Sequence, residues 1–261
     1  MKKKVAIVAL AVCAMTITSC APSISREEAL VKAEQIKQTI ENSGEYPAGD
    51  KFELAYTINQ SVESSGAKNG TNQKGSICID LTENYVRSHL ETTTFITVFG
   101  EDLAETEVTD IWAYMKDEKV YLGNKVTVAG EVKQNDVVEY ALDETSAAYL
   151  ENTIAETYSF VTSVFKSSVT SIFTYLNRLV NDDMLKAAGI TLGSNGEGSL
   201  IIKENVNVSV NSVSQKSFAL IEFENYLLKT MKADIKMSDP SSTQIKFVEY
   251  NFKYNTCSKS Y

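Results

Sequence analysis

KFELAYTIN, at residues 51–59, is the clearest secondary-structure signal in the chain. Its large apolar side chains stand at every second position, at Phe52, Leu54, Tyr56 and Ile58. A period of two places these side chains on one face of a β-strand and the polar residues between them on the other. The segment therefore predicts a strand with one buried face.

Similar strand patterns continue along the chain, separated by polar turns. Short turns such as Lys116-Asp117-Glu118-Lys119 join neighbouring strands as hairpins, which predicts an antiparallel sheet. A second strand is expected to start at Ser76, and the further segments expected to be strands are 85–98, 111–114, 120–122, 125–133, 137–142, 200–210, 218–237 and 244–254. We expect a polar turn at 64–75 and an acidic loop at 101–110.

The segment that precedes these strands has helical spacing. Ser25-Arg26-Glu27-Glu28 has the form of a capping box, in which the serine hydroxyl and the glutamate satisfy free N–H groups at the helix start. Gly44 and Pro47 predict where this helix stops. The apolar positions between are Leu30, Ala33, Ile36 and Ile40.

A second helical segment runs from Asp143 to Val180, and its apolar stripe is wider than a surface helix needs. The main stripe consists of Leu150, Ile154, Tyr158, Val161, Phe165, Ile172, Leu176 and Leu179. Phe160, Val164 and Phe173 widen it. Serine and threonine, which are weak helix formers, gather at 167–171 and predict a break there.

These patterns predict one α+β domain over residues 25–261, without an interdomain linker. Its architecture is expected to be a curved antiparallel sheet, similar to a half-barrel. The N-terminal helix and the central helical segment pack on this sheet.

The first twenty residues have the features of an export signal. Met1-Lys2-Lys3-Lys4 is basic, Val5–Met15 is apolar, and Ile17-Thr18-Ser19-Cys20 resembles the bacterial lipobox. The resemblance implies a signal peptide at 1–19, cleavage before Cys20, and a lipidated tether at 20–24. It also implies an extracytoplasmic protein held to the cell membrane by acyl chains on Cys20. The alternative is an ordinary signal peptide with a chance cysteine.

Composition excludes several function classes. A formal net charge of −9 and an isoelectric point near 4.9 disfavour a nucleic-acid partner, because phosphate recognition needs a basic face. With His89 as the sole histidine, histidine triads and multi-histidine metal sites are ruled out. The S-x-x-K matches at 65–68 and 163–166 lack the K-[ST]-G element of penicillin-binding enzymes. The acidic stretch at 101–110 lacks calcium-loop spacing. We therefore expect no catalysis, cofactor or metal.

Two further cysteines, Cys78 and Cys257, remain after export. An oxidising exterior permits a disulfide between them, which would close a long loop. The alternative is two independent cysteines, with Cys78 buried on a strand and Cys257 free in the tail. The sequence leaves both alternatives open, and it leaves any protein partner unknown.

The order of elements, with an N-terminal helix, a meander, a central helical segment and further strands, looks like the LolA/LppX-type lipoprotein-carrier architecture. That resemblance implies an open half-barrel that binds a lipid or another hydrophobic ligand beneath a helical lid. The residues expected to line it, from alternation, are Phe52, Leu54, Tyr56, Trp112, Tyr114, Ile221 and Phe223, with Phe160, Val164 and Phe165 on the lid. The alternative is a surface interaction or scaffold module with a solid core and no ligand.

Overall fold

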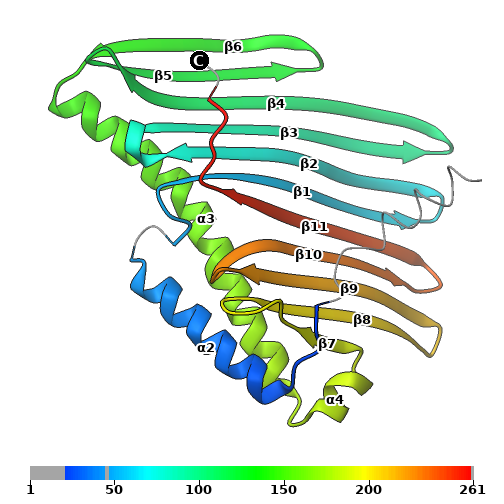
Figure 1. The fold of residues 1–261 in the computed structure, drawn as a ribbon. Helices are drawn as coiled ribbons and strands as arrows, with labels where there is room; N and C mark the ends of the chain where they lie inside the picture. The colour runs from blue at the N-terminus through cyan, green and yellow to red at the C-terminus, as the bar shows by residue number, and fades with distance from the viewer. Residues whose placement is uncertain (1–20, 45–46, 260–261) are drawn as a thin grey trace, which may run out of the picture.

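The computed structural model describes residues 21–44 and 47–259. In this part of the chain, eleven strands form one antiparallel sheet in the order β6-β5-β4-β3-β2-β1-β11-β10-β9-β8-β7 (Figure 1). The strands are β1 (Lys51–Ser64), β2 (Ala67–Asp80), β3 (Tyr85–Val98), β4 (Glu101–Lys116), β5 (Lys119–Val128), β6 (Glu131–Ala141), β7 (Ile190–Gly193), β8 (Leu200–Val210), β9 (Val213–Glu224), β10 (Leu227–Ser238) and β11 (Ser242–Tyr254). The helices are α2 (Arg26–Asn42), α3 (Glu144–Arg178) and α4 (Asp182–Ala187), with a short 3-10 turn η1 (Leu81–Glu83).

The sheet is made of two meanders that meet where β1 pairs with β11. The chain leaves the first meander at the β6 edge and enters the second at the β7 edge, so its connection must cross the whole sheet. Eleven strands spaced about 4.8 Å apart span about 48 Å. The 35 residues of α3 rise about 52 Å and match that width.

The predicted α+β class is confirmed, but the sheet is a large open one instead of a small half-barrel. Its two edge strands, β6 and β7, lie at opposite ends of the strand order and do not pair with each other. We call the face on which α3 packs the inner face and the opposite one the outer face. No helix in the described residues has the length and apolar character needed to cross a membrane.

The predicted break at 167–171 is wrong, since α3 is continuous from Glu144 to Arg178. The helix begins with a capping box in which Asp143 accepts from the Ser146 N–H. Its hydroxyl side chains donate back to carbonyls one turn earlier, for example Ser171 to Ser167 at 2.8 Å. These bonds satisfy the hydroxyls within the helix, so the serines and threonines do not interrupt it.

Two predicted loops are strands. The region 64–75 is a turn only at Ser65 and Gly66, after which β2 begins, and the acidic stretch 101–110 is the first half of β4. Thr97 donates to Asp102 at 2.6 Å, and Thr93 bonds to Thr106 at 2.9 Å. Charged side chains are tolerated here because this part of the sheet lies beyond α3 and faces solvent.

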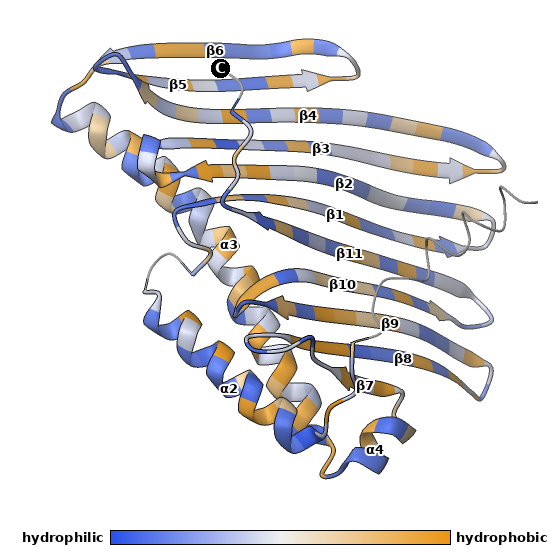
Figure 2. Cartoon of the chain, in the orientation of Figure 1, coloured by the Kyte–Doolittle hydropathy of each residue, from blue (hydrophilic) through white to orange (hydrophobic). Residues whose placement is uncertain are grey.

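The hydrophobic core lies at the end of the sheet that α3 crosses (Figure 2). Buried inner-face side chains come from the strand ends nearest the helix: Phe52, Leu54, Ile77, Ile79, Val86, Ala113, Val120, Leu200, Ile202, Ile221, Phe223, Leu228 and Phe252. They meet a buried stripe on α3 and the buried side of α2. The distal parts of the strands carry partly or fully exposed side chains.

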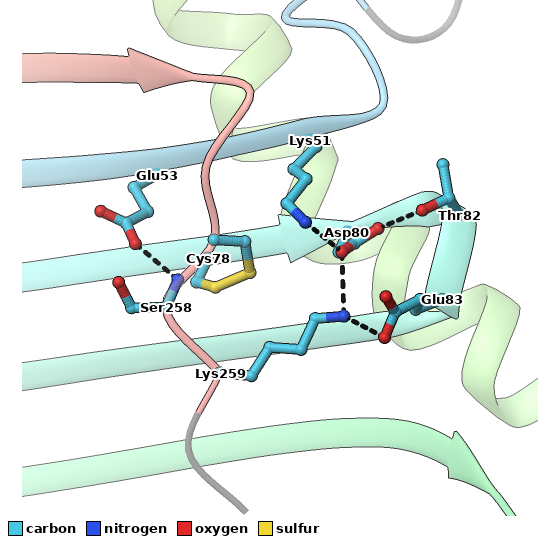
Figure 3. A network of polar contacts seen from close by, with 9 residues as sticks. Lys51, Glu53, Cys78, Asp80, Thr82, Glu83, Ser258 and Lys259 are labelled. Carbon is cyan, nitrogen blue, oxygen red and sulfur yellow. Dashed lines mark hydrogen bonds and ion pairs between the residues drawn. A yellow bond between two sulfur atoms is a disulfide. The ribbon is translucent and has the colours of Figure 1, made fainter.

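The C-terminal tail crosses the outer face and is bonded to it (Figure 3). Cys78 of β2 and Cys257 form a disulfide across 179 residues of sequence, which resolves the alternative that the sequence leaves open. The Ser258 N–H donates to Glu53 at 2.6 Å, and Lys259 pairs with Asp80 at 2.9 Å and with Glu83. The tail is therefore part of the folded body.

Candidate functional site

The space between α3 and the inner face, where a ligand cavity was expected, is filled by side chains. Six of the ten predicted lining residues are buried there. They are Phe52, Leu54, Val164, Phe165, Ile221 and Phe223. Phe165 meets the ring of Phe252 edge-on at 5.2 Å, and Phe52 meets that of Tyr158 at 5.3 Å. These residues build the core instead of lining a cavity.

Two other predicted residues, Tyr56 and Phe160, lie together at the margin of the core. The Phe160 ring is 5.6 Å from that of Tyr56 and 6.2 Å from that of Tyr250. Phe160 is 37% exposed, so this cluster borders solvent on the flank of α3 that faces the uncovered sheet. Burial raises the pKa of the Tyr56 and Tyr250 hydroxyls, which stay neutral at physiological pH.

The prediction that Trp112 and Tyr114 line the same surface is wrong. Their neighbour Ala113 is fully buried on the inner face, and adjacent residues of a strand point to opposite faces. The rings of Tyr114 and Tyr121 stack at 4.9 Å on the outer face. The Trp112 ring covers Gly123, where an added Cβ would lie 1.9 Å from it. Both aromatic residues therefore stabilise the outer face, away from α3.

A hollow lies on the other flank of α3, between α3 and α2. This helix groove has a volume of about 960 Å3, near the upper end of the range of roughly 300–1,000 Å3 for ligand pockets. Its lining residues are Lys37, Ile40, Glu41, Gly44, Pro47, Thr162, Lys166, Val169, Thr170, Phe173, Thr174, Asn177 and Arg178.

The packing of α2 explains where the groove opens. At the start of α2, the Arg26 Nε donates to the Leu176 carbonyl at 2.8 Å, which holds this end close to the last turn of α3. The residues of α2 buried in the first half are Ala29 and Ala33, whereas those in the second half are Ile36 and Ile40. Larger side chains hold helix axes farther apart. The groove accordingly involves the second half of α2.

Residues 47–49, which precede β1, lie beside the groove and contact α3. Tyr158 accepts a hydrogen bond from the Ala48 N–H at 2.9 Å and donates to the Gly49 carbonyl at 3.0 Å. Pro47 precedes these contacts and lines the groove. This segment is thereby tied to the buried side of α3.

The groove combines an apolar floor with a charged rim. Ile40, Pro47, Val169 and Phe173 supply the apolar side chains, and Val169 and Phe173 pack against the core. Lys37 Nζ lies 5.8 Å from the centre of the Phe173 ring, a cation–π contact. Apolar side chains beside several polar and charged ones are suited to non-covalent binding of an amphipathic molecule.

The helix groove is not predicted from the alternation of apolar residues, because that pattern indicates only the surfaces that meet between α3 and the sheet. A signal was nevertheless present, since Phe173 widens the stripe of α3 beyond what one packing surface requires. The extra width serves a second surface that faces α2. Of the other predicted site residues, Cys20 lies outside the described residues.

The chemistry-bearing residues elsewhere form local contacts. His89 and Arg87 both bond to Asp110 on the outer face, at 2.9 and 3.1 Å. Within residues 21–44 and 47–259, no three His, Cys, Asp or Glu side chains gather into a group able to hold a metal ion.

Comparisons with known proteins place the chain in no family. No family model matches the sequence, and no curated protein matches it significantly. One similar solved structure is a beta-barrel-like protein of the domain of unknown function DUF1849 from Brucella abortus. The two chains are 7% identical, and the match covers 78% of this chain and 98% of the other. The TM-score is 0.25, so the likeness carries no argument about function.

Proposed function

We propose that this protein is a non-catalytic extracytoplasmic lipoprotein, anchored to the cell membrane through acyl chains on Cys20, that binds the hydrocarbon part of an amphipathic ligand in the helix groove. The observation that carries the proposal is the groove itself. It offers about 960 Å3 beside an apolar floor, whereas the space under α3 is filled.

The anchoring part of the proposal is supported by the lipobox and by the position of the residues that follow it. Ser23 bridges to Gly193 of β7, Ile24 N–H donates to the Leu192 carbonyl, and Ser194 N–H donates to the Pro22 carbonyl. The expected tether is therefore bonded to the fold from Pro22 onward. Acyl chains on Cys20 would hold the β7 edge close to the membrane.

Anchoring is tested by labelling producing cells with radioactive palmitate. The full-length protein should incorporate label and fractionate with membranes, and Cys20→Ala should do neither. Label retained by Cys20→Ala, or release of the unsubstituted protein into the medium, would contradict the anchor.

Ligand binding is tested by native mass spectrometry on residues 21–261, which contain every described element of the fold. We expect a co-purified acyl lipid that is lost on solvent extraction and regained when membrane lipid is added back. A clean protein mass that takes up no lipid would rule out the ligand-binding proposal.

A matched pair of variants locates the site. Phe173 lines the helix groove, whereas Phe160 lies on the opposite flank of the same helix, against Tyr56. Phe173→Gln should reduce lipid uptake, and Phe160→Gln should leave it unchanged. The reverse result would indicate that the ligand binds on the inner face of the sheet. Thermal melting of both variants checks that each is folded.

The interaction module remains a second candidate, because the filled core favours it. The inner face extends beyond α3 and holds a shallow groove of about 440 Å3 near the distal strand ends. Its side chains include Gln60, Val62, Ile235, Met237 and Lys246, a mixed surface typical of protein contacts. If Ile235→Asp abolished cross-linking of the protein to an envelope partner and left lipid uptake unchanged, the result would favour this function.

A further inference from the structure

We propose that the helix groove selects a long-chain carboxylate, that is, an anionic single-chain amphiphile, over a neutral amphiphile with the same hydrocarbon chain. The inference rests on the proposed function, since it names the ligand class of the same groove. It is carried by the charges at the rim and by the composition of the floor.

The rim is cationic although the protein is acidic. Among the described residues that line the groove, Lys37, Lys166 and Arg178 are cationic and Glu41 is the one carboxylate, while the whole chain has a formal net charge of −9. Local charge of the sign opposite to that of the whole protein is the pattern expected where an anionic ligand binds.

The two cations on α3 are available to a ligand. In the described part of the chain, neither Lys166 nor Arg178 forms an ion pair with a carboxylate. Lys37 pairs with Glu34 only at 3.5 Å and extends over the Phe173 ring. A carboxylate at the rim would therefore gain charge-assisted hydrogen bonds without displacing a close internal partner.

The floor favours one hydrocarbon chain. Its apolar side chains, Ile40, Pro47, Val169 and Phe173, lie between two helices, and threonines border them along α3. The lining residues of α3 extend from Thr162 to Arg178, which corresponds to about 24 Å of helix. The apolar lining residues of α3 are only Val169 and Phe173, so this small apolar surface, with cations among the other lining residues, matches one hydrocarbon chain that ends in a carboxylate.

The test compares radiolabelled palmitate, hexadecanol and hexadecyl phosphate in equilibrium binding to residues 21–261. We expect palmitate to bind roughly 3- to 10-fold more tightly than hexadecanol, with the preference shrinking at high salt because the rim is exposed. Equal binding of palmitate and hexadecanol would overturn the carboxylate inference and leave the proposed function intact. Binding of none of the three would overturn both. A clear preference for hexadecyl phosphate over palmitate would overturn the commitment to a carboxylate.

A charge-matched pair of variants assigns the preference to the rim. Lys166→Gln with Arg178→Gln should lower palmitate affinity roughly 3- to 10-fold and leave hexadecanol affinity unchanged. Lys216→Gln with Lys236→Gln removes the same net charge from exposed outer-face positions and should change neither. An equal loss of palmitate affinity in both pairs would mean that net charge alone, and not the groove, attracts the ligand.

Discussion

Tyr158 of α3 holds Ala48 by a 2.9 Å hydrogen bond from the Ala48 N–H to its hydroxyl. The same hydroxyl donates to the Gly49 carbonyl, so one side chain satisfies two backbone groups of the segment that leads from α2 into β1. Both Tyr158 and Ala48 are about 2% exposed. Water therefore cannot easily replace either bond.

Removing the hydroxyl should destabilise the protein. We expect Tyr158→Phe to lower the free energy of unfolding by about 1–3 kcal/mol, the cost of leaving a buried N–H without a partner. Urea denaturation measures the change. Tyr149→Phe, on an exposed position of the same helix, is the control and should have no effect. A Tyr158→Phe protein as stable as the parent would show that these bonds contribute nothing net.

The disulfide should be a large contributor to stability. Its two cysteines are 179 residues apart, and the chain-entropy model gives about 5 kcal/mol for a loop of that length. Reduction with dithiothreitol, or Cys257→Ser, should lower the midpoint of guanidinium unfolding. Reductant should have no further effect on a Cys78→Ser, Cys257→Ser double variant. A reduced protein with an unchanged midpoint would contradict this account.

Asp80 should make stability depend on acidity. Burial by itself would raise its pKa, but the hydrogen bond from Thr82 and the ion pairs with Lys259 and Lys51 outweigh burial and hold the pKa of Asp80 well below its ordinary value. A carboxyl group whose pKa is lower in the folded state stabilises the fold at pH values above its unfolded-state pKa. This contribution is lost as the pH falls from the unfolded-state pKa to the folded-state pKa.

We therefore expect Asp80→Asn to cost about 1.5–3 kcal/mol at pH 7, the contribution of a charge-assisted hydrogen bond. The difference from the parent protein should shrink as the pH falls below about 4, where unfolded Asp80 takes up a proton. Denaturation curves across this range measure it. A difference that is constant with pH would indicate that the charge of Asp80 is irrelevant.

Gly123 should be required for the position of Trp112. A Cβ at Gly123 would lie 1.9 Å from the indole, so Gly123→Ala must displace the ring. We expect a loss of about 1–3 kcal/mol, as for overpacking, and a red shift of the fluorescence of this sole tryptophan. Gly130→Ala is the control for the emission: its added Cβ would meet no neighbouring atom, so the fluorescence should stay unchanged, although the φ of +82° at Gly130 makes alanine there destabilising as well. Unchanged emission from Gly123→Ala would contradict the contact.

The same geometry predicts that Trp112 is no part of a ligand site in the helix groove. Trp112→Ala should lower stability because the ring packs on the outer face, yet leave lipid uptake unchanged. Native mass spectrometry of the folded variant measures uptake. A specific loss of uptake would return Trp112 to the site.

The sequence by itself determined the features that depend on local periodicity. Alternation at 51–59 and helical spacing after Ser25 identify β1 and α2, because a buried face repeats every two residues in a strand and about every 3.6 in a helix. The α+β class follows from these elements. The serines and threonines at 167–171 misled the local prediction, because hydrogen bonds to the preceding turn allow α3 to continue through them.

Only the tertiary structure decided which face each strand presents and where the hollow lies. Ile111-Trp112-Ala113-Tyr114 is apolar at every position, so its sequence does not indicate which side chains point to which face of the sheet. The pairing of β4 with β3 places Ala113 on the inner face and Trp112 on the outer face. The disulfide likewise depends on β1 lying between β2 and β11. The helix groove exists because α2 packs against a second flank of α3, a contact between segments more than one hundred residues apart that no local pattern encodes.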